Sequence, residues 1–262
     1  LRRLNQLTGP FILRRMKSEV LRELPPKTEN VRRVELETEQ RKLYLAAVVD
    51  AREKLRAAKP EDKMTVFAVL MRLREICCDP RLVADNWAGS SAKLEACLEL
   101  VTEAVAGGHR ILLFSQFTSM LELLAKRLDE AGVSHFTLQG STPKPVRAEQ
   151  VRRFNQGEAD VFLISLRAGG TGLNLTAADI VIHYDPWWNL AAQNQATDRA
   201  YRIGQRNPVQ VYRLIAQDTI EEKIVELQQA KQSLADTVTG GADGAILSMN
   251  PEQLLQLLGE EV

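Results

Sequence analysis

Short apolar runs and amphipathic stretches alternate along the last two thirds of the chain. The runs at 111–114, 161–164 and 180–182 have the length and composition of buried strands. The stretches between them repeat apolar residues at helical spacing, as at Leu94 and Leu98. Strands that alternate with helices are typical of a parallel sheet covered by helices. The pattern therefore predicts an α/β fold, with helices on both faces of a parallel sheet.

The first third of the chain is predicted to be helical apart from one edge strand. Breaks rich in Gly and Ser at 89–91 and in Gly at 237–244 divide the chain into segments 1–90, 91–235 and 236–262. The strands are expected at 31–36, 111–114, 135–138, 161–164, 180–182 and 209–215. The helices are expected at about 38–58, 64–78, 94–105, 117–128, 146–154, 189–203, 220–234 and 251–258, with a further short helix before residue 29.

Composition and charge narrow the class of protein. The 262 residues are 45% apolar and 26% charged, which allows a sizeable core. Because the formal net charge is +0, any nucleic acid must be held by local basic clusters. Cys77 and Cys78 are neighbours, and none of the three cysteines has zinc-ligand spacing to a histidine, which indicates a reduced, intracellular protein without a metal site. No apolar run is long enough to cross a bilayer, and Leu1 in place of an initiator methionine suggests a piece of a longer protein.

Residues suited to ligand binding follow four of the predicted strands. They are Ser115-Gln116, Gly140-Ser-Thr142, a glycine loop at 169–172 and an aromatic loop at 185–189. In open parallel sheets, ligands gather outside the carboxyl ends of the strands, where free backbone amides point. We therefore expect these four loops to share one edge of the sheet and to form the functional site.

The glycine loop has two possible explanations. The chain contains no Gly-Lys dipeptide, which excludes a Walker A phosphate-binding loop. Thr171 and Asn174 could hydrogen-bond a nucleic-acid backbone, or the glycines could form only a tight turn between strand and helix. The run ending at Asp185 resembles a Walker B strand, but Pro186 stands where an acidic partner is expected, so we do not assign Asp185 as a magnesium ligand.

Two further features favour contact with nucleic acid and phosphate. Of the adjacent Trp187 and Trp188, one is expected to pack in the core while the other, for which we favour Trp188, stays free to stack or wedge against bases. The helix at 189–203 places Arg199 and Arg202 about one turn apart, beside Gln195, as in a phosphate clamp. The alternative is a surface helix in which Asp198 pairs with the arginines.

Several segments resemble motifs of helicase superfamily two, and more narrowly of the second RecA-like lobe of the Swi/Snf-type ATP-dependent DNA translocases, the chromatin-remodelling ATPases. ILLFSQFTSML at 111–121 resembles motif IV, ISLRAGGTGLNLTAAD resembles motif V, HYDPWWN resembles its Trp-bearing extension, and QATDRAYRIGQ resembles motif VI. LQGST, with Arg147 and Phe154, resembles the segment after motif IV. FILRRMKSEVLRELPPKTE and LREICCDP resemble the link from the first lobe and the helical protrusion. The resemblance covers nearly the whole chain.

The resemblance implies a residue-by-residue site. Arg199 and Arg202 would be arginine fingers that reach the ATP phosphates, with Gly170, Gln195 and Gln205 at the nucleotide. The residues expected to contact DNA are Ser115, Gln116, Thr171, Gly172, Asn174 and Trp188. ATP and Mg²⁺ would be held mainly by a first lobe, which this chain lacks. Gln139 departs from the acidic residue expected before Gly140, so no function is assigned to it.

The resemblance implies the second motor lobe of a double-stranded DNA-stimulated ATPase that translocates on DNA and remodels DNA-bound protein complexes. The partners would be DNA and the N-terminal RecA-like lobe, in the nucleus of a eukaryote or with the nucleoid of a prokaryote, and the chain alone would be catalytically inactive. Segment 1–90 would be the inter-lobe link and protrusion, 91–235 the RecA-like lobe and 236–262 a tail. The alternatives are a non-catalytic DNA- or protein-binding module that retains the fold, and a strand-separating helicase.

Overall fold

The fold is a parallel sheet of six strands, seen in a computed structural model that describes residues 24–166, 168, 172–235 and 249–259, with the side chains of 231–235 excepted. The strands are β1 (Lys27–Val34), β2 (Ile111–Ser115), β3 (His135–Leu138), β4 (Val161–Ser165), β5 (Ile180–His183) and β6 (Val209–Ala216). Their spatial order is β1-β6-β5-β2-β4-β3, and every neighbouring pair is parallel. The predicted α/β sheet is confirmed.

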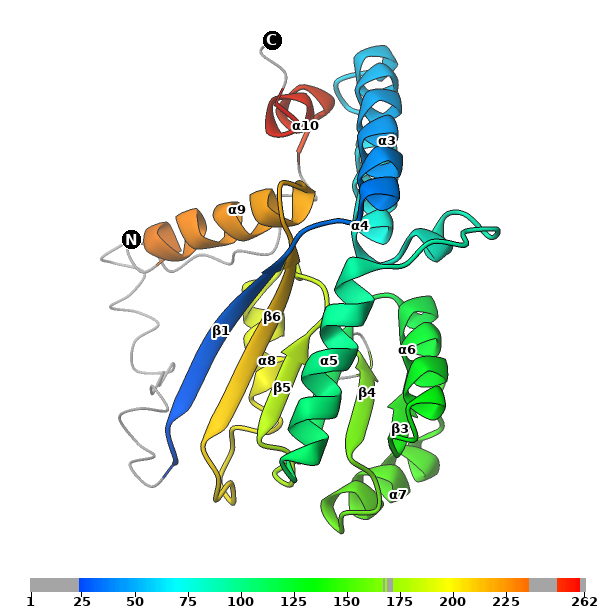
Figure 1. Cartoon of the computed structure of the whole chain (residues 1–262). Helices are drawn as coiled ribbons and strands as arrows, with labels where there is room; N and C mark the ends of the chain where they lie inside the picture. Colours follow the sequence, from blue (N-terminus) through cyan, green and yellow to red (C-terminus); the bar gives the residue numbers. More distant parts are fainter. Residues whose placement is uncertain (1–23, 167, 169–171, 236–248, 260–262) are drawn as a thin grey trace, which may run out of the picture.

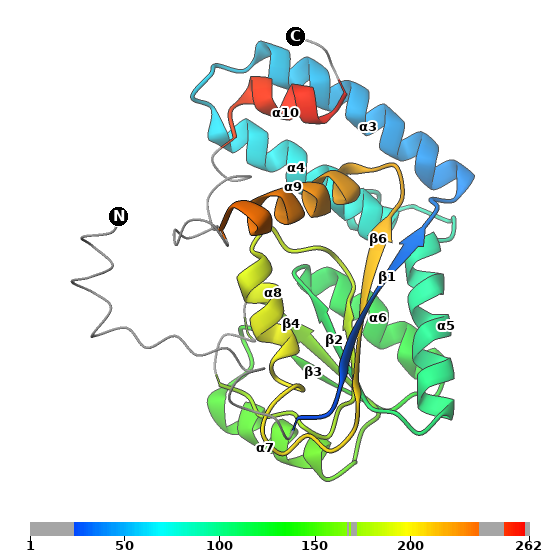
Figure 2. The ribbon, with the colours of Figure 1, turned by 90° about the vertical axis from the view of Figure 1, so that its left-hand side faces the viewer.

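Helices cover both faces of this sheet (Figures 1 and 2). They are α3 (Thr38–Ala57), α4 (Lys63–Cys78), a 3-10 turn η1 (Pro80–Leu82), α5 (Ala92–Ala106), α6 (Thr118–Glu130), α7 (Lys144–Asn155), α8 (Leu190–Thr197), α9 (Ile220–Ala235) and α10 (Pro251–Leu257). Among the helices in the described ranges, none is long and apolar enough to cross a membrane.

Successive residues of the central strands enter two different cores. Leu113 and Leu163 pack with α5 and α6 on one face, whereas Leu112 and Phe162 pack with α7 and α8 on the other. Both faces are therefore apolar, which explains the unbroken apolar runs of these strands. β1 is mostly exposed because it lies at an edge of the sheet, as its mixed polar sequence predicts.

The helical protrusion stands at the carboxyl end of the strands (Figure 1). It consists of the α3–α4 hairpin with α10 packed beside it, and its own core joins Leu55, Leu70 and Leu73 to Leu254. Ile220 of α9 also belongs to this core. Because β1 pairs with β6 and α10 packs on α3, the three predicted segments contact one another closely, and the boundaries between them remain a prediction.

Buried polar contacts join α5 to α9, and the end of α4 to the residue that follows β5. Lys93 and Glu221 are fully buried and form an ion pair, with the Lys93 Nζ atom 2.5 Å and 2.6 Å from the two carboxylate oxygens. The Tyr184 hydroxyl donates to the Cys78 carbonyl oxygen at 2.8 Å. The three cysteines are buried and unbridged, and burial raises the pKa of Cys77. Cys77 and Cys78 pack as small buried hydrophobes at the end of α4.

The helix predicted at 189–203 is shorter than expected. α8 ends at Thr197, and turns follow as far as Gly204, where φ is +102°. The Arg199 carbonyl oxygen accepts from the Leu175 amide at 3.1 Å instead of bonding within a helix. The helix therefore ends before Ile203, which was expected to lie within it and is instead 70% exposed.

His183 gives the fold a pH dependence. Its Nε2 atom lies 2.9 Å from the Thr197 hydroxyl, and its ring stacks on Phe114. Burial, with a smaller effect from Arg213 and Lys27, lowers the pKa of His183 to about 3. The folded protein therefore keeps this imidazole neutral, whereas an unfolded chain binds a proton below about pH 6.5.

We therefore expect the stability that depends on His183 to be complete above about pH 6.5 and to be lost as the pH falls toward about 3. Between about pH 7 and pH 5, this residue should account for a loss of about 2 kcal/mol in the free energy of unfolding. Denaturant unfolding of the parent and of His183→Gln at the two pH values measures the difference. Equal pH dependence in the two proteins would contradict the assignment.

Candidate motor-lobe site

The loops after β5, β2, β4 and β3 follow strands that are consecutive in the sheet. Because the strands are parallel, their carboxyl ends lie at one edge (Figure 1). All four loops therefore start at this edge, as predicted, and residues 169–171 of the glycine loop lie outside the described residues. The protrusion stands at the same edge, so the loops are flanked by helix α4.

Asp185 is the centre of the polar contacts at this edge. Its side chain is fully buried. The carboxylate accepts from the Ser115 hydroxyl at 2.6 Å and from the Gln116 backbone amide at 3.2 Å, and it pairs with the Arg74 Nη2 atom at 3.3 Å. Burial raises the pKa of Asp185, and Arg74 and Ser115 oppose that shift. The contacts give Asp185 a structural function and are consistent with the prediction that it does not bind magnesium.

Ser115 does not lie where the sequence predicts. It was expected to contact DNA, but its side chain is fully buried. Its hydroxyl donates to Asp185 and accepts from the Phe117 amide at 3.1 Å, so the serine positions the loop after β2. Gln116, the next residue, is partly exposed, and its Nε2 atom lies 4.0 Å from the Met71 sulfur.

The two tryptophans do not divide into a buried and a free one. Both side chains are half-buried. Trp188, expected to be the free one, packs on the protrusion core, with its ring centroid 4.0 Å from the Arg74 guanidinium carbon and 6.4 Å from the Phe67 ring centroid. This correction arises because α4 lies beside the loop, which the local sequence does not reveal. Trp188 is still partly open to solvent.

The glycine loop is described only in part. Gly170 and Thr171 lie outside the described residues. Gly172 is exposed with φ at +38°, and no atom lies within 4 Å of the place where a Cβ would stand. Asn174 is also exposed, and its carbonyl oxygen accepts from the Asn155 amide group at 2.8 Å. The described end of the loop therefore presents backbone and amide groups to solvent.

The two arginines lie beside this loop end. Arg199 is only 4% exposed, and its Nε atom has no hydrogen-bond partner among the described residues. Burial and then the neighbouring Arg202 lower the pKa of Arg199. Arg202 is exposed, and its Nη1 atom donates to the Leu173 carbonyl oxygen at 3.4 Å. Two cationic groups with spare donors fit an anion approached from this surface.

The two glutamines assigned to the nucleotide differ sharply. Gln195 is exposed on α8. Gln205 is only 7% exposed, and its Nε2 atom donates to the carbonyl oxygens of Ala178 and Ala200 at 2.7 Å and 3.2 Å. Its Oε1 atom accepts from the two backbone amides that follow, at 2.8 Å and 2.9 Å. These four bonds use the strong hydrogen-bonding capacity of a glutamine side chain. Gln205 therefore stabilises a turn and does not fit the expected contact with nucleotide.

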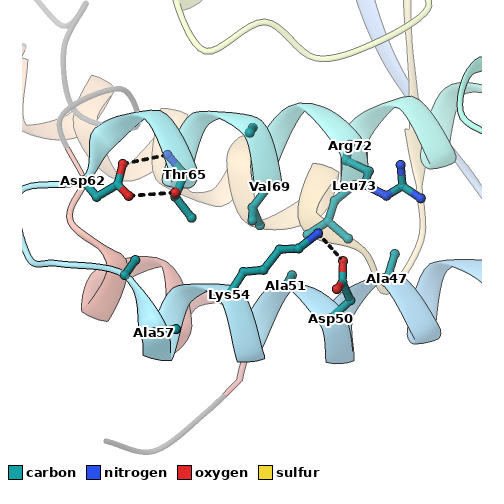
Figure 3. Close-up of a pocket in the computed structure, with 12 residues that line it drawn as sticks. Ala47, Asp50, Ala51, Lys54, Ala57, Asp62, Thr65, Val69, Arg72 and Leu73 are labelled. Carbon is teal, nitrogen blue, oxygen red and sulfur yellow. Dashed lines mark hydrogen bonds and ion pairs between the residues drawn. The ribbon is translucent and has the colours of Figure 1, made fainter.

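No acidic cluster accompanies the arginines. Within the described residues, no group of three or more His, Cys, Asp or Glu side chains could hold a metal ion. A cavity of about 490 Å³ lies between α3 and α4, lined by alanines with the Asp50–Lys54 pair at its rim (Figure 3). Its lining includes none of the predicted site residues. The described residues thus fit the cationic side of a phosphate site.

Comparison with known proteins identifies the family. The chain matches the helicase conserved C-terminal domain over residues 92–204 and the SNF2-related domain over residues 1–82. A putative ATP-dependent helicase/translocase of Bacillus subtilis is 40% identical over 97% of this chain and 28% of its own length. The chain belongs to the SNF2-related helicase family. It spans about a quarter of the length of the curated relatives it matches.

Solved structures of the SNF2-related family identify the lobe. The C-terminal domain of the Sulfolobus solfataricus SWI2/SNF2 ATPase has a TM-score of 0.74 at 28% identity, with 90% of this chain and 100% of that domain covered. The core of that ATPase in complex with double-stranded DNA has a TM-score of 0.75 at 30% identity, with 100% of this chain and 56% of that chain covered. The predicted RecA-like C-terminal lobe with helices on both faces is confirmed.

Sequence reasoning missed Arg74 as a residue of this edge. In the sequence it stands at helical spacing with Phe67, Leu70 and Met71. An arginine within an apolar stripe was the available signal, because a buried charge needs a partner elsewhere in the fold. That partner is Asp185, 111 residues later in the chain.

We expect Gln205→Ala to lower the free energy of unfolding by about 1–3 kcal/mol, because two buried carbonyl oxygens and two partly buried amides lose their partner. Gln195→Ala, at the exposed position, should change it by less than about 0.5 kcal/mol. Denaturant unfolding of the two variants measures both effects. Unchanged stability in Gln205→Ala would restore the nucleotide-binding interpretation.

Proposed function

We propose that this chain is the second motor lobe of a double-stranded DNA-stimulated ATPase that translocates on DNA and remodels DNA-bound protein complexes. Family membership supports the proposal, as do the name of the Bacillus subtilis relative and the likeness to an ATPase core solved with double-stranded DNA. The proposed partners are DNA and the first RecA-like lobe, inside the cell.

The observation on which the proposal rests is the direct contact between the arginine segment and the glycine-loop end. The Leu175 amide donates to the Arg199 carbonyl oxygen at 3.1 Å, and Arg202 donates to the Leu173 carbonyl oxygen at 3.4 Å. One segment has free cationic donors, and the other has exposed backbone and amide groups. A shift of the arginines toward a phosphate would therefore move the loop that is proposed to touch DNA.

The proposed function of the arginines is charge stabilisation during phosphoryl transfer. ATP with Mg²⁺ would supply the reactive phosphate, held mainly by the first lobe and by the acidic groups there. Arg199 is fixed by burial, with its Nε atom unpaired, and Arg202 is free to extend. Both lie on the turns after α8. Gln195 on α8 and Gly170 of the glycine loop are also proposed to support the nucleotide. Without the first lobe, this chain is proposed to be inactive.

The proposed DNA contacts lie in loops that start at the carboxyl edge of the sheet. Gln116 is partly exposed in the loop after β2, Gly172 and Asn174 are exposed in the glycine loop, and Thr171 belongs to the glycine loop. Polar side chains and glycine backbone are suited to the phosphate-sugar backbone of DNA, which fits a motor that must move without reading sequence. Trp188 is proposed to stack or wedge against the strand.

Arg202→Ala in the complete protein is expected to lower ATP turnover by roughly a thousandfold to a hundred-thousandfold, as loss of an arginine finger does elsewhere. DNA affinity should be retained. Arg206→Ala, at an exposed arginine of the same segment, is the control and should keep turnover within about twofold. Turnover within about tenfold of the parent in Arg202→Ala would refute the finger assignment and favour a non-catalytic module.

Trp188→Ala in the complete protein is expected to lower DNA-stimulated turnover more than basal turnover, because the indole would couple the strand to the motor. Trp87→Ala, at a half-buried tryptophan of the loop before α5, serves as the control. Turnover measured with and without duplex DNA separates the two rates. An equal fall in both rates would place Trp188 among the packing residues only.

A further inference from the structure

Arg74 is a buried arginine whose polar contacts all lie in another part of the fold. It belongs to α4 of the protrusion and is fully buried. Its Nη2 atom donates to the Pro186 carbonyl oxygen at 2.5 Å and lies 3.3 Å from the Asp185 carboxylate. Both partners belong to the loop after β5. The charge is therefore used to hold that loop, and a buried charge without such partners would be costly.

The guanidinium also lies between two aromatic rings. Its carbon is 4.0 Å from the Trp188 ring centroid and 5.5 Å from the Phe117 ring centroid. The Nε and Nη1 atoms have no hydrogen-bond partner among the described residues. A planar guanidinium can stack on a ring and at the same time donate in its own plane, which a lysine ammonium cannot do. The geometry therefore depends on an arginine and not on any cation.

One face of α4 contacts two of the three loops that are proposed to touch DNA, those after β2 and β5. Phe67, Met71 and Arg74 recur at helical spacing along this face. Phe67 lies 6.4 Å from Trp188 between ring centroids, and the Met71 sulfur lies 4.0 Å from the Gln116 side chain. The protrusion thus supports the loop after β2 and the loop after β5 together.

We propose that Arg74 is a positioning residue that holds the indole of Trp188 in its partly exposed orientation, so that the helical protrusion sets how the motor grips duplex DNA. The inference rests on the proposed function, in which Trp188 contacts DNA. It assigns a specific function to the protrusion, in which α4 supports the loops after β2 and β5.

The test is a double-mutant cycle in the complete protein, with Arg74→Lys, Trp188→Phe and the double variant. ATP turnover is measured against the concentration of a blunt duplex. Arg74→Lys should raise the DNA concentration needed for half-maximal stimulation by about tenfold, because the charge stays while the stacking plane is lost. The double variant should be no worse than the more impaired single variant, since both changes remove one shared contact. Arg72→Lys, at an exposed arginine of the same helix, should match the parent.

The cycle separates a positioning function from a packing function. If Arg74→Lys lowers basal and stimulated turnover in the same proportion, or if the effects of the two single variants multiply, the proposal is wrong. If Trp188→Phe and Trp188→Ala both leave DNA stimulation intact, the proposed function loses its tryptophan contact. If Trp188→Ala impairs stimulation and Arg74→Lys does not, only the positioning inference fails.

A second variant keeps the test decisive if Arg74→Lys does not fold, as judged by thermal unfolding. Phe67→Leu touches Trp188 from the same helix face without disturbing the buried ion pair, and Phe67 is 37% exposed. It should raise the half-maximal DNA concentration by about threefold and be non-additive with Trp188→Phe. An unchanged DNA dependence in Phe67→Leu would then overturn the proposal.

Discussion

The buried carboxylate of Asp185 is the contact on which the arrangement of the carboxyl edge depends. It stands just beyond β5 and binds the loop after β2 through Ser115 and Gln116, and the protrusion through Arg74. Removing water from a carboxylate is costly unless its hydrogen-bonding capacity is filled. Asp185 and its partners come from three separate stretches of the chain, so this cost is offset only when strands, loop and protrusion are all in place. The same contact therefore connects folding to the geometry of the site.

Two different surfaces follow from this arrangement. The carboxyl edge presents Gln116 and Trp188, and the glycine loop starts there, while the turns after α8 hold the buried Arg199 and the exposed Arg202. The two surfaces are joined by hydrogen bonds between the loop end and the arginine segment. A DNA-translocating motor requires such a link, because a change at its nucleotide site must alter how it binds DNA. In the proposed account, the chain supplies half of the nucleotide site and one side of the DNA site.

The architecture could be predicted from the sequence because periodicity reflects burial directly. The unbroken run at 161–164 and the stripe beginning at Leu94 each report on a single element and its face. The contacts of the site could not be predicted in the same way, because they join residues that are distant in the chain. In the sequence, Ser115 follows a strand and has no evident partner nearby. In the structure, its hydroxyl donates a hydrogen bond to Asp185, which lies 70 residues later in the chain.

The same reason explains the other corrections. Gln205 resembles a site residue by its motif, but its hydrogen-bonding capacity is used within the fold. Its side chain donates to the carbonyl oxygens of Ala178 and Ala200 and accepts from the two backbone amides that follow it. Trp188 was judged from its neighbours in sequence, whereas α4 covers it in space. Motif resemblance thus named candidate site residues, and only the packing distinguished the exposed ones from those that hold the loops.

The central claim is that one edge of this lobe faces DNA while the turns after α8 face a nucleotide held by the other lobe. Hydrogen exchange of the complete protein tests it directly, with duplex DNA alone, with a transition-state analogue of ATP alone, and with both. The account predicts that DNA protects the amides of 115–117, 172–175 and 187–189, and that the analogue protects 198–204. Protection of the arginine segment by DNA alone, with no effect of the analogue there, would contradict it.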